Sequence, residues 1–160
     1  MTTFLIFLHV VAAILLLGPV VVSTSMFPRQ VAESRAGGEE ATGRASVLYR
    51  ITKTYGMLSL LVPLLGGAVL AFDWDTYKSN YWFHTAIVLS VIGWAILLAM
   101  VIPQQRKMMG TIGALPPAEA DPSDVTGKFE KSKAKATAGA GIFNLLWMLV
   151  LILMFLPDPS

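Results

Sequence analysis

The 160-residue sequence contains no cysteine. This absence excludes disulfide bonds, thiolate metal sites, covalently attached haem and cysteine nucleophiles. Charged side chains are scarce, at 14% of the residues, whereas 55% of the residues are hydrophobic. A chain of this length with a mean hydropathy of +0.65 is too apolar for a soluble domain. The composition therefore predicts a small polytopic membrane protein.

Motifs that mark common catalytic and nucleotide-binding sites are also missing. The chain has no P-loop, no Gly-x-Gly-x-x-Gly, no His-Glu-x-x-His and no serine-centred nucleophile elbow. The calculated pI is about 9.0, but the net charge is only +2 and the basic residues lie beside apolar runs. Membrane topology explains that distribution better than a nucleic acid does, so no nucleic-acid partner is expected.

Four apolar runs approach or exceed the roughly 20 residues that a helix needs to cross a bilayer. They span about 3–27, 54–72, 81–103 and 138–156. The sequence therefore predicts an all-α fold in which four transmembrane helices form an up-down bundle, as one membrane domain over 1–160. The segments 28–53 and 104–137 are expected to be loops on one membrane face.

These loops and the chain ends carry further local signals. Apolar residues at helical spacing over 44–55 predict that the second helix starts before it enters the membrane. The segment 113–124, rich in proline, alanine and aspartate, is expected to be poorly ordered. The first run is expected to be retained as a span, because no Lys or Arg precedes it. Pro157 and Pro159 are expected to close the last helix.

Helix-breaking and small residues inside the runs predict how the helices pack. Gly18 and Pro19 predict a kink in the first helix, because proline removes a backbone donor and clashes with the preceding turn. Pro63, Gly66 and Gly67 are residues that let two membrane helices approach closely. We therefore expect these five positions to shape helix packing rather than chemistry.

A polar and aromatic tip, residues 73–84, joins the second and third runs. Its tyrosine and tryptophan rings favour the headgroup level of a membrane. Eleven of the twelve Lys and Arg residues lie in the two predicted loops, and only Lys78 lies in the tip. The positive-inside rule then places both loops in the cytoplasm and both termini on the outer face. The predicted localisation is the bacterial inner (plasma) membrane, as a multi-pass protein.

Polar side chains inside the spans are few. The only two histidines, His9 and His84, fall roughly 5–8 Å below the outer boundary at 1.5 Å per residue. Such a pair would suit axial haem b ligation, a copper site or a proton relay. It would also suit hydrogen bonds to headgroups, backbone carbonyls or a partner, which is favoured because neither histidine has a third ligand three or four residues away. For Asn144, an interhelical hydrogen bond of about 1 kcal/mol is expected rather than a substrate contact.

Two stretches carry a family resemblance. Phe-Leu-His9-Val-Val-Ala-Ala near the start, a basic approach to the second run, and Leu-Ile-Leu-Met154-Phe-Leu-Pro157 at the end resemble a family of uncharacterised four-helix bacterial integral membrane proteins. The Leu-His-Val opening is also similar to copper-resistance CopD-like and HemJ-like membrane proteins. Some of these bind haem through that early histidine, which corresponds to His9. The further charged and aromatic residues of the HemJ-like pattern are missing here.

The size, the four spans and the basic cytoplasmic loops resemble accessory subunits of actinobacterial cytochrome bcc and oxidase supercomplexes, such as the supercomplex association factor. That resemblance implies a larger respiratory complex as partner, besides the lipid bilayer. We therefore expect a non-catalytic accessory or assembly subunit of such a complex, without a cofactor. The alternative is a membrane protein that binds haem b or a metal through His9 and His84. A small transporter ranks third, because the spans contain no Asp, Glu, Lys or Arg.

Overall fold

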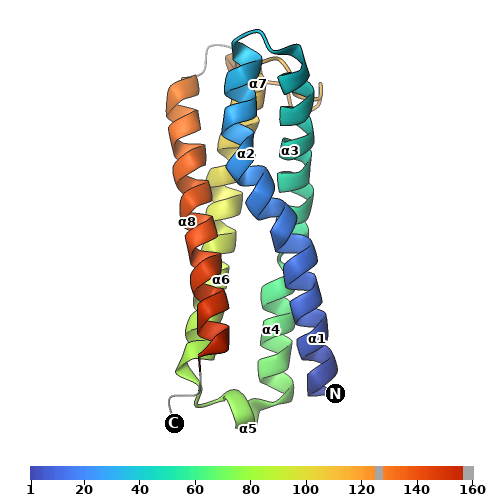
Figure 1. Ribbon diagram of the computed structural model, residues 1–160, viewed down its shortest axis with the longest axis vertical. Coiled ribbons are helices and arrows are strands. Elements are labelled where there is room, and N and C mark those ends of the chain that lie inside the picture. The colour runs from blue at the N-terminus through green and yellow to red at the C-terminus, as the bar shows by residue number, and fades with distance from the viewer. Residues whose placement is uncertain (125–127, 157–160) are drawn as a thin grey trace.

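Four long rods of helix form the protein, and the computed structural model describes residues 1–124 and 128–156 of it (Figure 1). The first rod consists of α1 (Thr2–Ala12), the π-helical turn η1 (Ala13–Leu17) and α2 (Gly18–Arg35). The others comprise α3 (Glu39–Leu58) with α4 (Leu61–Phe72), then α6 (Tyr81–Ile96), η2 (Leu97–Val101) and α7 (Ile102–Thr111), and finally α8 (Phe129–Phe155). Short helices α5 (Trp74–Tyr77) and η3 (Pro122–Asp124) lie in the connections. The predicted all-α bundle of four apolar helices, and with it a multi-pass membrane protein, is confirmed.

The first two rods are longer than a membrane is thick. Each contains 34 residues, Thr2–Arg35 and Glu39–Phe72, or about 51 Å at 1.5 Å per residue, against a hydrocarbon core of about 30 Å. The loop predicted at 28–53 is therefore helical apart from residues 36–38, and that part of the prediction is wrong. The expected early start of the second helix is confirmed, and it begins at Glu39.

Local interactions explain why this charged segment is helical. Ion pairs one turn apart, Arg29 with Glu33 and Arg44 with Glu40, lie along the two helices. The turn between them uses Gly37, which has a φ of 96° that favours glycine. The amide of Gly38 donates to the carbonyl of Glu33 at 3.1 Å, which closes α2 as a Schellman motif does. Charge counting alone misses this pattern, because it does not register the spacing of the charges.

The second predicted loop is shorter than 104–137 and is partly packed. Helix α7 continues to Thr111 and α8 begins at Phe129, so helix occupies much of both flanks. The segment 113–124, expected to lack order, folds back onto the helices, where Asp124 is buried. The expected helix stop at Pro157 and Pro159 lies outside the described residues, and Phe155 is the last residue of α8.

Each of the first three rods departs from regular α-helical geometry near a proline. The π-helical turn η1 immediately precedes Gly18 and Pro19, and Figure 1 shows the bend between α1 and α2 that the sequence predicts. The turn η2 stands in the same relation to Pro103. Ser59, at the break between α3 and α4, lies four residues before Pro63, where a proline ring clashes with the helix backbone.

The bundle is closed at one end and open at the other. At the end that carries the α2–α3 turn, α2 and α3 pack against α7 and α8 around a core that includes Phe27, Tyr49 and Met108. A second core nearer the middle includes Leu97 and Phe143. Towards the termini, α1 pairs with α4 and α6 pairs with α8, and the two pairs diverge (Figure 1).

Candidate functional site

An apolar groove of about 610 Å³ lies between the α1/α4 pair and the α6/α8 pair. All four helices contribute to its walls, together with Tyr77 of α5 and Leu156 at the end of α8. Its aliphatic and aromatic lining includes Ile6, Val10, Ile14, Leu17, Val62, Val69, Phe83, Ile87, Val150, Leu151, Met154 and Phe155. The groove exists because the helix pairs diverge where the bundle opens.

His9 is the polar side chain of α1 in this wall. Its Nδ1 lies 3.0 Å from the backbone oxygen of Val62 on α4. A carbonyl only accepts hydrogen bonds, so Nδ1 is the donor and carries the proton. The ring reaches α4 because Gly66 has no side chain: a Cβ there would lie 3.3 Å from His9 Cε1. His9 thus joins α1 to α4 across the groove wall.

Two further polar residues of the lining, Ser90 and Asn80, form hydrogen bonds within the protein. The Ser90 hydroxyl donates to the carbonyl of Ala86 at 2.7 Å. The Asn80 side chain accepts from the amide of Phe83 and caps α6. The Trp147 indole nitrogen is buried, without a hydrogen-bond partner in the described structure, at 3.6 Å from where a Cβ on Gly93 would stand. The groove therefore presents mainly hydrocarbon to its occupant.

The structure places one of the two predicted histidines, His9, in the groove wall. His84 Nδ1 donates to the carbonyl of Asn80, one turn earlier in its own segment, at 2.9 Å. His84 is not among the residues that line the groove, whereas His9 is. Within 1–124 and 128–156, no group of three or more His, Cys, Asp or Glu residues could hold a metal ion. His9 and His84 therefore do not meet in the wall of this groove.

The predicted packing residues differ in what surrounds them. Gly66 and Pro63 line the groove, and a Cβ on Gly66 would meet the His9 ring. A Cβ on Gly67 or on Gly18 would meet no atom of residues 1–124 or 128–156 within 4 Å, so neither glycine marks a close approach there. Pro19 begins α2 after the π-helical turn.

The interhelical hydrogen bond predicted for Asn144 is confirmed. Its Nδ2 donates to the Ser25 hydroxyl of α2 at 3.1 Å, so the amide joins α8 to the first rod. A buried bond between the Ser23 and Thr52 hydroxyls, at 2.8 Å, joins α2 to α3 in the same way. Sequence reasoning did not single out that pair, although small hydroxyl residues at helix contacts are a general signal for it.

A polar cluster at the closed end was also missed. Glu119, in the segment between α7 and α8, accepts from the Tyr49 hydroxyl at 2.9 Å and from Lys53 Nζ at 2.5 Å. Arg106 donates to the Glu119 carbonyl at 2.6 Å and forms an ion pair with Asp124 at 3.2 Å. The partners lie up to 70 residues apart, so no local sequence pattern indicates them.

Charge and burial shift the pKa values in this cluster. The hydrogen bond from Lys53, followed by that from Tyr49, holds the pKa of Glu119 below its usual 4.5. Burial, then the hydrogen bond to the Glu119 carboxylate, raises the pKa of Tyr49. Glu119 therefore remains a carboxylate and Tyr49 a phenol donor at neutral pH, which suits an anchor for this segment.

Comparisons of this chain with protein-family models, with curated proteins and with solved structures found no match.

Proposed function

We propose that this protein is a non-catalytic accessory subunit of a larger membrane complex, and that the apolar groove lies at its contact with that complex. A respiratory electron-transfer supercomplex is the partner that the sequence resemblance implies. The groove is the observation that supports the proposal, because it offers a shaped surface for binding inside the membrane.

The chemistry of the groove favours binding over reaction. General acid–base or nucleophilic catalysis needs paired groups within hydrogen-bond reach of each other. Among the described lining residues, His9 and Tyr77 alone have ionisable side chains, and Nδ1 of His9 is committed to Val62. The remaining wall is mainly hydrocarbon, which recognises an apolar ligand by burial of its surface.

The volume of the groove, about 610 Å³, falls in the range of about 300–1,000 Å³ that is usual for small-molecule sites. We assign the groove to the hydrocarbon chain of a lipid, which fills the gap between the two helix pairs at the contact with the partner.

A bulky side chain in the groove tests this function. Val10 lines the groove and is 47% exposed, whereas Val88 of α6 is 57% exposed and lies outside the groove. In native gels of mild-detergent extracts, we expect the wild type and Val88→Trp to co-migrate with a larger complex. We expect Val10→Trp to lose most of that co-migration, and native mass spectrometry to show loss of the bound lipid.

Two results would contradict this proposal. One is a wild-type protein that migrates as a free monomer in extracts of its own membrane. The other is equal assembly of Val10→Trp and Val88→Trp, with both variants helical by circular dichroism. A Soret band in the pure protein that disappears in both His9→Ala and His84→Ala would instead favour the haem b alternative.

A further inference from the structure

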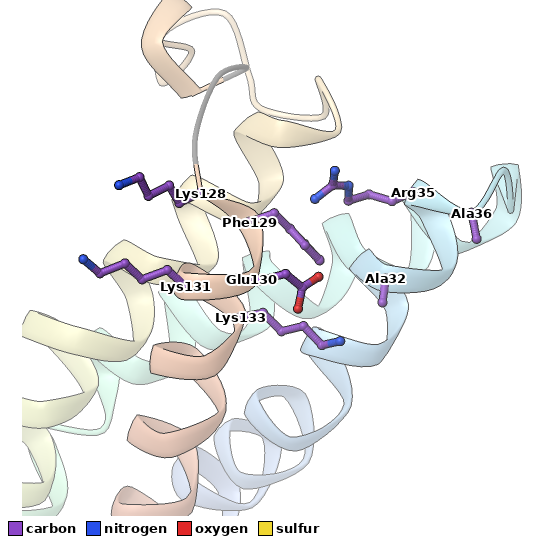
Figure 2. Close-up of a pocket in the computed structure, with 8 residues that line it drawn as sticks. All are labelled: Ala32, Arg35, Ala36, Lys128, Phe129, Glu130, Lys131 and Lys133. Carbon is purple, nitrogen blue, oxygen red and sulfur yellow. The ribbon is translucent and has the colours of Figure 1, made fainter.

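A second cavity, of about 580 Å³, lies at the opposite end of the molecule from the groove. It is formed by the end of α2 and the first turns of α8 (Figure 2). Its lining residues are Ala32, Arg35, Ala36, Lys128, Phe129, Glu130, Lys131 and Lys133. Half of these eight residues are basic, in contrast to the hydrocarbon of the groove.

The charges around this cavity do not balance among the residues that line it. Four cations and one carboxylate, Glu130, line it, which leaves 4 − 1 = +3. In the described part of the chain, none of the four cations forms a salt bridge. All the salt bridges there use other cations, namely Arg29, Arg44, Lys53, Lys78 and Arg106. Seven of the twelve Lys and Arg residues form no salt bridge in the described part of the chain, and four of these seven line this one cavity.

The Phe129 ring, which lines the cavity, contacts one of these cations, Arg35. The Phe129 ring is 7% exposed and packs in the core of the closed end. The Arg35 guanidinium lies 4.1 Å from the centre of that ring, and Figure 2 shows it reaching from α2 towards Phe129. Among the described residues, no side chain caps the start of α8 at Lys128, and the amides of its first turn add positive potential.

We propose that this cavity binds the phosphodiester headgroup of an anionic phospholipid. Guanidinium and ammonium groups around one cavity match the charge and the hydrogen-bond acceptors of a phosphate. The place in the fold selects a lipid, because α8 is a candidate membrane span and the cavity lies at its polar first turns. Lysine stems can follow the apolar surface of the span while their ammonium groups meet the headgroup layer.

A charge-matched pair of triple variants tests this site. Arg35→Gln/Lys131→Gln/Lys133→Gln removes three cations that line the cavity. Arg50→Gln/Lys107→Gln/Lys135→Gln removes one arginine and two lysines that are exposed at the same end of the molecule but lie outside the cavity. The full-length proteins in mild detergent are titrated with phosphatidylglycerol or with phosphatidylcholine of identical acyl chains, and bound lipid is counted by native mass spectrometry.

We expect the wild type and the control triple variant to prefer phosphatidylglycerol, and the cavity variant to lose that preference by about tenfold or more. Equal loss in both variants, or no preference in the wild type, would overturn the proposal. Competition by free glycerol phosphate as effective as that of the lipid would also overturn it, because the ligand would then be a soluble phosphate.

If the cavity variant fails to fold, Lys128→Gln/Lys131→Gln/Lys133→Gln leaves the Arg35–Phe129 contact intact and takes its place. The groove lies at the other end of the bundle, so this test and that of the accessory function can fail independently.

Discussion

The absence of a side chain at Gly66 shapes the part of the groove wall that His9 occupies. His9 reaches the backbone of Val62 beside Gly66, where a Cβ would lie 3.3 Å from the His9 ring. The neighbouring Gly67 has open space around it, so the two glycines differ in context while sharing the same helix. A comparison of substitutions at these two positions therefore separates the packing role of Gly66 from the general effect of glycine in a helix.

We predict that Gly66→Ala is less stable than Gly67→Ala by about 1–3 kcal/mol, the usual cost of overpacking a filled site. Both substitutions gain the same helix propensity, so the difference reports the contact with His9. Reversible unfolding in mixed micelles, followed by circular dichroism, measures it. Equal stabilities would show that the His9 ring moves aside freely and does not hold α1 against α4.

At the scale of elements, the segment between α7 and α8 is held by the cluster around Glu119. Gly110 of α7 belongs to the same contact, because a Cβ there would stand 2.4 Å from the Cβ of Asp124. The segment therefore packs against a helix surface that has no room for a larger residue. Its attachment depends on the ionisation of Glu119, because Lys53 and Tyr49 both donate to that carboxylate.

This dependence predicts that the segment detaches in acid. The pKa of Glu119 is lower in the folded protein than its usual 4.5, so the anchor is fully present above pH 4.5 and is lost as the pH falls through the lower, folded pKa. The anisotropy of a fluorophore on Ala118→Cys should fall in that window. Glu119→Gln should flatten the change, whereas Glu39→Gln, at an exposed site of the same end, should not. An unchanged acid transition in Glu119→Gln would exclude this anchor.

In the whole molecule, both the distribution of charge and the shape of the bundle distinguish the closed end from the open end. The closed end carries eleven of the twelve Lys and Arg residues, and the open end carries Lys78, the exposed rings of Trp74 and Tyr81, and the groove. We propose that the closed end faces the cytoplasm and that both termini face outward. The groove then opens in the outer half of the bilayer, and the basic cavity lies at the cytoplasmic headgroups.

Single-cysteine labelling measures this orientation directly, because the native chain has no cysteine. An impermeant maleimide should label Ser79→Cys in intact cells and should label Ala118→Cys only after the membrane is opened. Both positions are exposed in the structure, so a missing signal reports the membrane side rather than burial. The reverse pattern at both positions would overturn the orientation and would place the basic cavity at the outer headgroups.

The sequence by itself determined the features that depend on local chemistry. Four apolar runs fix four membrane helices, because the transfer of backbone and side chains into a bilayer depends on the composition of each segment. Proline acts on its own helix, so the bend at Pro19 was also predictable. Asn144 was foreseen as an interhelical donor because an amide in an apolar span needs a partner, although its partner Ser25 was not.

Only the tertiary structure decided what depends on the rotation and spacing of the helices. It placed His9 in the groove wall and left His84 outside that wall, although both histidines have similar depths in the sequence. It brought Glu119 to Tyr49 across 70 residues, and Arg35 to Phe129 across the ends of two rods. Such contacts follow from how the four rods pack against one another. That packing is set by the summed burial of side chains from all four rods, and not by the composition of any one of them.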